Sequence, residues 1–393
     1  MKLLQALAVI VVAVSLAASA QLAHAFLQPG SGPDRVAAQV RWLNGQRDAG
    51  AAARMQELFP EGEFFTQLLT GLAAASLDDA ATVDSALRDT GTSTVKERFG
   101  TIAELDGGTF YRGWRLLLLT ERVRLTGDGS DTLLAEASAV QGALAAAPTG
   151  VPASYPGGYW PCDAVVAMAA VVRAQSQAGA PADPAGVAAW RAKLDGLRDP
   201  ATGLLPHRIS ADGDDREQPR GSSQAIIQTF WPDLDATGAP DQWRRFVAAF
   251  VVREAGLVGV REYPRGSQGT GDEDSGPLLF GVSASASAVT LAAARRNGAA
   301  ELAADLDHEA EYLGLPLEWS GERRFAFGVM PVGDAFVAWA RSVPTAPATA
   351  SSAPRPLWWA YAPAFLLPAI AVALVAVRHR RRTRVSTSST SGG

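Results

Sequence analysis

The stretch GGYWPCDAVVAMAAVVRAQSQA, residues 157–178, decides what kind of fold this chain forms. Its first seven residues mix glycine, proline and aromatic side chains, a composition typical of loops. The rest is an alanine- and valine-rich run that contains no glycine or proline. This run predicts a helix over 161–178 that is entered from an aromatic loop, with Asp163 in its first turn, where the helix dipole favours a carboxylate.

The same alternation of apolar runs and Gly- and Pro-rich breaks recurs along the chain, with apolar residues spaced three and four apart. Alternating β periodicity is nearly absent, apart from short pieces at 204–209 and 258–263. An all-α fold of about a dozen helices is therefore expected. The other predicted helices cover 34–58, 62–77, 79–88, 108–125, 130–147, 184–198, 221–235, 240–255, 277–297, 299–313 and 332–342.

The C-terminal end contains an uncharged apolar run at 357–377, followed by five arginines between Arg378 and Arg384. A run of roughly 20 apolar residues matches the hydrocarbon thickness of a bilayer, and clustered arginines stay on the cytoplasmic side. This pattern predicts one transmembrane helix over 357–377 and a basic cytoplasmic tail over 378–393. A Pro-, Ala-, Ser- and Thr-rich segment, 342–356, is expected to form an extended stalk in front of the span.

The N-terminal segment 1–25 has the order of a secretory signal: Lys2, an apolar run and a small-residue site ending in Ala25. It is either cleaved or retained as a second membrane anchor. Both alternatives put a domain at 26–341 outside the cytoplasm, in a protein of the bacterial cell envelope.

The composition excludes some classes of partner and of stabilising bond. Without Lys2 and the five tail arginines, 29 Lys and Arg oppose 40 Asp and Glu, a net charge of about −11 that argues against nucleic acid as partner. Cys162 is the single cysteine, so no intramolecular disulfide can form. Two histidines remain in the predicted domain, which argues against a His-rich zinc site, and we expect neither a metal nor a cofactor.

The first candidate loop, 153–163, carries Tyr155, Tyr159 and Trp160 close to Asp163. Aromatic rings of this kind stack on the apolar faces of sugars, while a nearby carboxylate binds hydroxyl groups. The same rings could instead cover the core.

The second candidate loop contains His207 beside a proline, an acidic run at 212–215 and Arg220 directly before a predicted helix. His207 could carry a proton or simply anchor the loop by a hydrogen bond. Ser222 or Ser223 is expected to cap the helix that follows. The acidic run is expected to be a solvated turn, and Arg220 is a candidate ligand for substrate.

The third candidate loop carries Glu262 and Tyr263, then a Gly-rich stretch and the acids Asp272, Glu273 and Asp274. Adjacent carboxylates repel, so a fold accepts them in water, beside cations, or where one stays protonated to act as an acid. The candidate catalytic residues are thus Asp163, His207, Glu262, Asp272 and Asp274, and the candidate substrate-binding residues are Tyr155, Tyr159, Trp160, Arg220 and Tyr263.

A dozen helices joined by loops with GGYWPCD at 157–163, GLLPHR at 203–208, VREYP at 260–264 and GDEDSGPLLFG at 271–281 resemble an α/α toroid. This barrel of about six helical hairpins occurs in six-hairpin glycosidases and in proteins similar to linalool dehydratase/isomerase. The resemblance implies a site in a funnel at one end of the barrel, where an acid and a base flank the reacting bond.

Three functions are consistent with these residues. The first is a carbohydrate-active hydrolase in which one carboxylic acid protonates a leaving oxygen and another activates water, as carboxyl groups about 6.5–9.5 Å apart do in inverting enzymes. The second is a non-catalytic protein that binds a glycan, a lipid-linked ligand or an assembly partner. The third is a dehydratase or isomerase that uses Cys162 with Asp163 and requires an accessible thiol.

Overall fold

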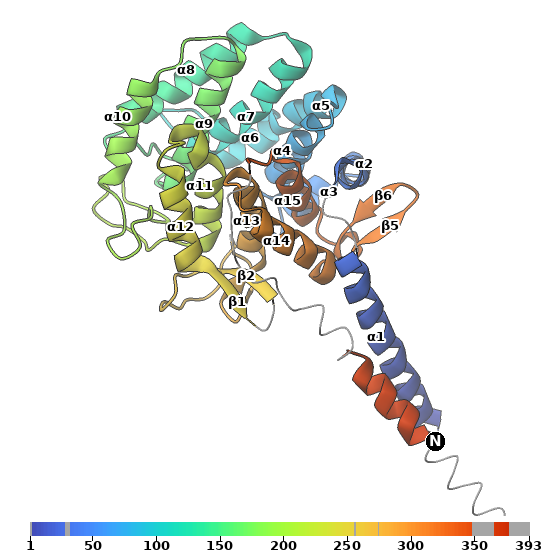
Figure 1. Ribbon diagram of the computed structural model, residues 1–393. Coiled ribbons are helices and arrows are strands. Elements are labelled where there is room, and N and C mark those ends of the chain that lie inside the picture. Colours follow the sequence, from blue (N-terminus) through green and yellow to red (C-terminus); the bar gives the residue numbers. More distant parts are fainter. Residues whose placement is uncertain (1, 28–31, 255–256, 274, 348–364, 377–393) are drawn as a thin grey trace, which may run out of the picture.

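A computed structural model describes residues 2–27, 32–254, 257–273, 275–347 and 365–376. Within these residues, six helices form a closed ring in which each helix packs on the next and the last packs on the first (Figure 1). The ring helices are α4 (Gly62–Ala75), α7 (Gly108–Thr126), α9 (Pro161–Gln177), α11 (Gly221–Leu234), α13 (Ala284–Arg296) and α15 (Pro331–Ser342).

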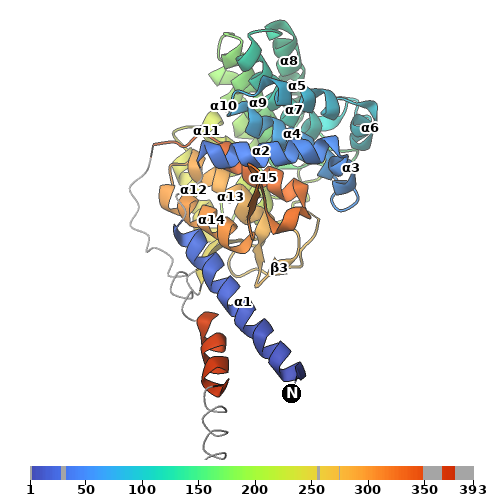
Figure 2. The same cartoon turned by 90° about the vertical axis from the view of Figure 1, so that its right-hand side faces the viewer.

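A second set of helices lies outside the ring and alternates with the first along the chain. Figure 2 shows one of them, α2, running along the outside of α4 and α15. The outer helices are α2 (Pro33–Asp48), α5 (Ala80–Thr90), α8 (Ser130–Ala146), α10 (Pro184–Asp195), α12 (Ala239–Phe250) and α14 (Ala300–Leu313). Because inner and outer helices alternate, all six ring helices begin at the same end of the ring.

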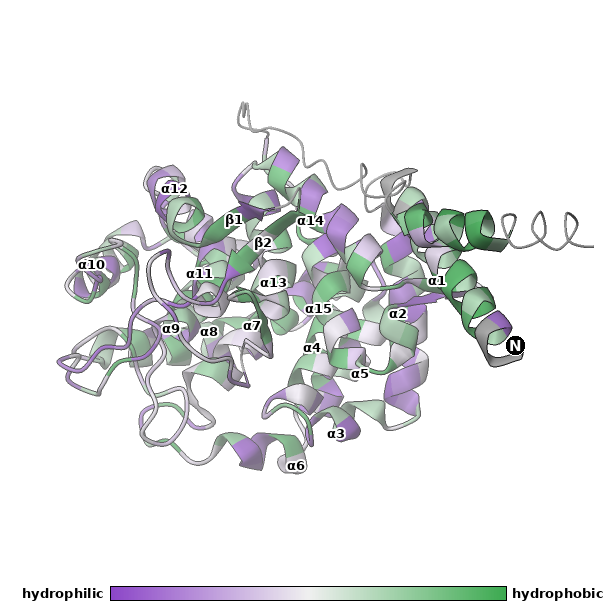
Figure 3. Ribbon diagram, turned by 90° about the horizontal axis from the view of Figure 1, so that it is seen from below, coloured by the Kyte–Doolittle hydropathy of each residue, from purple (hydrophilic) through white to green (hydrophobic). Residues whose placement is uncertain are grey.

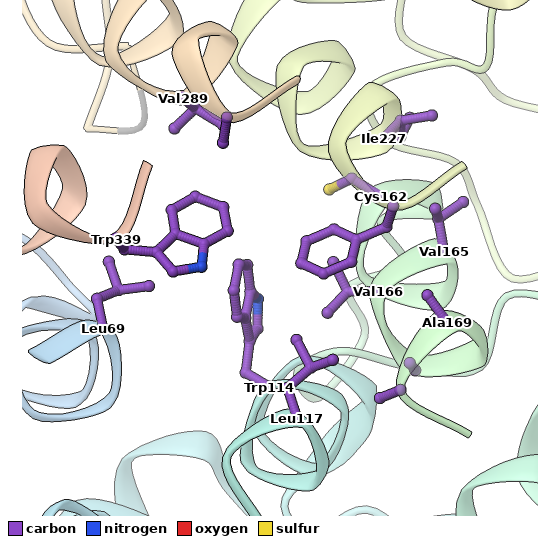
Figure 4. Close-up of a cluster of buried hydrophobic side chains, with 14 of the residues drawn as sticks. Leu69, Trp114, Leu117, Cys162, Val165, Val166, Ala169, Ile227, Val289 and Trp339 are labelled. Atoms are coloured by element: carbon purple, nitrogen blue, oxygen red, sulfur yellow. The ribbon is translucent and has the colours of Figure 1, made fainter. Parts of the chain in front are cut away.

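The axis of the ring is filled by apolar side chains from several ring helices. The indole of Trp114 on α7 packs edge-on against Phe230 at 5.5 Å and against Trp339 at 5.6 Å. Figure 4 shows Trp114, Trp339, Leu69 and Val289 converging from different helices. A centre packed with apolar side chains leaves the two ends of the ring as the places where polar chemistry can occur.

The two ends differ in the length of their loops. The chain leaves each ring helix through a short connection, at 76–79, 127–129, 178–183, 235–238 and 297–299. It enters each ring helix through a longer segment, at 49–61, 91–107, 147–160, 196–220, 251–283 and 314–330. The entry segments contain the short elements α3 (Ala51–Met55), α6 (Ser93–Lys96), η1 (Glu97–Phe99) and η2 (Ala326–Gly328). All three candidate loops belong to the entry end.

Two small antiparallel sheets also lie in the entry segments. The strands are β1 (Val251–Glu254), β2 (Leu257–Arg261), β3 (Leu278–Leu279) and β4 (Val282–Ser283) in the order β1-β2-β4-β3, and β5 (Leu317–Trp319) with β6 (Glu322–Arg324). Val251 is opposite Val260 in the first sheet. That sheet leads the chain from α12 to α13 and places Glu262 directly after β2.

The predicted fold class, an all-α toroid with a C-terminal transmembrane helix, is wrong. The sheets contradict the all-α assignment, because β-branched residues at 251–260 pair as strands where a helix was expected to continue to residue 255. No helix within the described residues is long and apolar enough to cross a membrane. Of the predicted span, the described residues 365–376 are helical.

Several other terminal predictions lie wholly or partly outside the described residues: 357–364 and 377 of the span, 348–356 of the stalk and the tail 378–393. At the other terminus, α1 (Lys2–Leu27) extends away from the ring and is mostly hydrophobic (Figure 3). Gln21 on α1 donates a hydrogen bond to the backbone carbonyl of Glu311 on α14. The predicted signal segment and the extracytoplasmic location stay predictions.

Candidate functional site at the entry end of the ring

The first turn of α11 is the centre of the candidate site. The N–H of Gly221 donates to the backbone carbonyl of Glu262 at 2.8 Å, so α11 begins against the residue that follows β2. A Cβ on Gly221 would lie 2.0 Å from the carbonyl oxygen of Arg261, a separation that no side chain can accept. Glycine is therefore required for this close approach of two backbones.

Glu262 is completely buried and its carboxyl group is held by Ser222. The hydroxyl of Ser222 donates to Oε1 at 2.8 Å and its N–H donates to Oε2 at 3.2 Å. Burial raises the pKa of Glu262 to about 7, and the nearby charge of Asp272 adds to this rise, while the Ser222 bonds and Arg220 oppose it. At neutral pH, Glu262 is thus poised between its protonated and ionised forms.

His207 is a second buried titratable group of this site. It lies beside Ser223, which follows Ser222 in α11. Its Nδ1 shares a hydrogen bond with the hydroxyl of Ser223, and its backbone N–H donates to the carbonyl of Glu217 at 3.2 Å. Burial, reinforced by the charges of Arg220 and Arg208, lowers the pKa of His207 to about 3. The imidazole is therefore neutral at pH 7 and suits hydrogen bonding better than proton transfer.

Arg220 and Asp272 form an ion pair beside these groups. Arg220 also contacts Glu217 at 3.2 Å, and its guanidinium lies 5.5 Å from the centre of the Tyr263 ring. Burial alone would raise the pKa of Asp272, but the N–H of Ser275 and the charge of Arg220 outweigh it and lower that pKa. Asp272 is therefore a carboxylate at neutral pH, close enough to act on the pKa of both Glu262 and His207.

The aromatic residues of the first loop form a half-buried wall beside this cluster. Tyr155 and Trp160 pack edge to face at 5.4 Å, and the guanidinium of Arg208 lies 5.0 Å from the Trp160 ring. The carbonyl of Tyr159 accepts a hydrogen bond from Ile209 at 3.0 Å, which joins the first loop to the second. The rings thus border the polar cluster and also cover part of the core.

Asp163 and Cys162 occupy the first turn of α9, and both are buried. The Cys162 thiol donates to Oδ1 of Asp163 at 3.7 Å, and Figure 4 places the sulfur among the core side chains. The dehydratase or isomerase hypothesis requires an accessible thiol, whereas this one is 6% exposed.

Two contacts join the three loops: the Ile209 N–H bonds the Tyr159 carbonyl between the second and first loops, and Arg220 pairs with Asp272 between the second and third. His207, Glu262, Asp272, Arg220 and Tyr263 form one cluster. Tyr155, Tyr159 and Trp160 flank it, and Asp163 lies at the start of the neighbouring ring helix. Asp274 lies outside the described residues.

The prediction that Ser222 or Ser223 caps the helix is wrong, and the sequence analysis did not identify one residue of the site. Arg220 is the N-cap of α11, while Ser222 and Ser223 lie inside the first turn and hold Glu262 and His207. The residue missed is Glu61, which accepts a hydrogen bond from the Tyr155 hydroxyl at 2.6 Å. No local pattern marks Glu61, because its partner is 94 residues away.

An open hollow of about 370 Å³ lies next to the cluster, lined by Gly271, Asp272, Glu273, Gly276 and Pro277. A second hollow, of about 270 Å³, lies between α10, α11 and α12, away from the candidate residues. We centre the site on the first hollow because Asp272 connects it to Arg220, His207 and Glu262. Among the described residues, no group of three or more His, Cys, Asp or Glu could hold a metal ion.

The sequence was also compared with known proteins. No protein-family model matches the chain, and no curated protein matches its sequence.

Proposed function

We propose that this protein is a carbohydrate-active hydrolase whose acid and base are Glu262 and Asp272. The supporting observation is that these two interacting carboxyl groups have pKa values displaced in opposite directions, up to about 7 for Glu262 and downward for Asp272. Pairs of this kind divide the acid and base roles of a hydrolytic reaction between them. The aromatic wall supports a sugar ligand, because such rings stack on the apolar faces of pyranoses.

In the proposed reaction, protonated Glu262 gives its proton to the leaving glycosidic oxygen as the C–O bond breaks. The Asp272 carboxylate takes a proton from the water molecule whose oxygen attacks the anomeric carbon. Arg220 keeps Asp272 in its ionised form. Neutral His207 forms a hydrogen bond with a sugar hydroxyl. One water molecule is consumed in the hydrolysis. Glu262 has then lost a proton and Asp272 has gained one, and transfer of a proton from Asp272 to Glu262 restores both carboxyl groups.

The test is hydrolysis of a panel of p-nitrophenyl glycosides by the purified chain. Glu262→Gln and Asp272→Asn should each lower kcat at least about 100-fold, the usual contribution of an acid or base. Glu309→Gln is the matched control, because Glu309 on α14 is also a buried carboxyl with a raised pKa, about 8, but lies outside the cluster. Equal loss in all three variants, or no loss in any, would contradict the proposal.

A second candidate function is glycan binding without turnover. The observation that favours it is the complete burial of Glu262, whose two oxygens already accept hydrogen bonds from Ser222. In this second function, Glu262 joins α11 to β2 and takes no part in a reaction. Oligosaccharide binding by a protein that releases no nitrophenol from any glycoside would support this candidate.

A further inference from the structure

Glu61 is a carboxyl group at the entry end that the proposed mechanism does not use. It precedes α4, and its backbone carbonyl accepts the hydrogen bond of Phe65 at 2.8 Å, so it belongs to the start of that ring helix. Its Oε1 accepts the Tyr155 hydroxyl at 2.6 Å. Among the described residues, Glu61 forms no ion pair, and besides the Tyr155 hydroxyl only its own backbone N–H bonds the carboxyl group. Because a carboxylate has about four acceptor positions, this half-buried group can still accept a hydrogen bond from a ligand.

The Tyr155 ring that bonds Glu61 is itself held in place by other aromatic rings. Its ring packs on Phe110 at 5.6 Å, on Phe99 at 6.0 Å and edge-on against Trp160 at 5.4 Å. These contacts order the ring, so its hydroxyl fixes the direction of the Glu61 carboxyl group. The same tyrosine therefore belongs to the aromatic wall and to the carboxyl group beside it.

Glu61 also lies within electrostatic reach of the hollow. Burial raises the pKa of Glu61, the Tyr155 bond lowers it, and the negative charge of Glu273 raises it. Glu273 lines the 370 Å³ hollow next to Asp272. The segment before α4 and the loop before α13 both lie at the entry end, and the ring helices that they lead into pack on either side of α15.

We propose that Glu61 is a substrate-binding residue that accepts a hydrogen bond from a sugar hydroxyl at the hollow, and that Tyr155 is its positioning residue. This inference rests on the proposed function, since it requires a hydroxyl-rich ligand. In this arrangement Glu262 and Asp272 act at the reacting bond, and Glu61 binds the sugar from the α4 side.

The probes are cellohexaose, xylohexaose and maltohexaose, with binding followed by tryptophan fluorescence, and the p-nitrophenyl glycosides with kcat and KM measured separately. Glu61→Gln should raise Kd and KM roughly tenfold or more and change kcat less than about threefold, because a charge-assisted hydrogen bond to the ligand is lost. Tyr155→Phe should shift both constants in the same direction by a smaller factor. Glu63→Gln, which removes a carboxyl group two residues away that pairs with Arg98 at 2.7 Å, is the matched control and should match the wild type.

Each result decides between the two proposals. An unchanged Kd in Glu61→Gln overturns the role of Glu61 and leaves the hydrolase standing, and a lower melting temperature with unchanged Kd does the same by assigning Glu61 to the fold. Oligosaccharide binding without any hydrolysis overturns the hydrolase. The role of Glu61 in binding is then decided by the Kd of Glu61→Gln compared with that of the wild type. A wild-type protein that binds none of the three oligosaccharides overturns the role of Glu61.

Discussion

Two consecutive serines in the first turn of α11 hold two titratable side chains of different character. Ser222 bonds a glutamate that is half protonated near neutral pH, and Ser223 bonds a histidine that stays neutral. Both shifts come mainly from burial, which disfavours the charged form of either group. The chemical state of these residues is therefore a property of their surroundings.

The stability of the protein should depend on pH through Glu262. Its pKa is about 7 in the folded state against an ordinary 4.5, so its stabilising contribution is complete below about pH 4.5 and is lost as pH rises to 7. Gln cannot ionise. The unfolding free energy of Glu262→Gln relative to wild type should therefore rise by up to about 3 kcal/mol across this window. Urea unfolding at pH 4.5 and pH 8 measures it, and a difference that is independent of pH would refute the shift.

Gly221→Ala should destabilise the protein by about 2 kcal/mol or more, because the new Cβ must push α11 away from the Arg261 carbonyl. The control is Gly142→Ala in the middle of α8, where nothing lies within 4 Å of the added Cβ. That change should stabilise by about 0.5–1 kcal/mol through helix propensity. Urea unfolding of both variants gives the comparison, which fails if the two changes have the same sign.

A buried network of charges joins α2, α14, α15 and β6. Arg341 on α15 contacts Asp307 at 2.7 Å and also Glu311, both on α14, and Glu311 pairs with Arg323 on β6. Arg35 on α2 lies 3.6 Å from Glu311. Four elements thus depend on a single buried carboxylate.

Glu311→Gln should lower the unfolding free energy by about 3–5 kcal/mol, because it leaves buried arginines without their shared partner. Glu121→Gln is the control, since Glu121 pairs with Arg124 on an exposed face of α7 and its loss should cost less than about 1 kcal/mol. Thermal and urea unfolding at pH 7 measure both. Similar melting temperatures for the two variants would show that the network does not hold α14, α15 and β6 together.

At the scale of the whole molecule, the ring is closed around an aromatic centre. Trp114 is fully buried and contacts side chains from α4, α11 and α15, so a substitution there is felt by several helices at once. The filled axis also explains why the candidate residues gather at one end: polar groups are accommodated where the longer entry segments lie.

Trp114→Ala should cost about 3–5 kcal/mol, the range for removing a buried aromatic side chain. Trp319→Ala at the β5–β6 hairpin should change stability by less than about 0.5 kcal/mol, because that indole is 79% exposed. Differential scanning calorimetry of both variants provides the measurement. A small effect of Trp114→Ala would mean that the centre can collapse around the cavity.

Most helices could be predicted from local pattern, because periodicity and Gly or Pro breaks are properties of neighbouring residues. The expected helix 108–125 is observed as Gly108–Thr126, and 161–178 as Pro161–Gln177. The prediction failed at 277–297, where β3 and β4 precede a helix that begins at Ala284. Those strands form only because β4 pairs with β2, more than twenty residues earlier along the chain.

The sequence by itself determined the helical segments, the acidic charge and the three loops that carry candidate residues, since each is encoded within a short window. Only the tertiary structure decided the partners: Ser223 for His207 across 16 residues, Ser222 for Glu262 across 40 and Tyr155 for Glu61 across 94. It also decided which groups are buried, and hence their pKa values. The physical reason is that burial and long-range contacts arise only when the ring closes, and no local pattern encodes that closure.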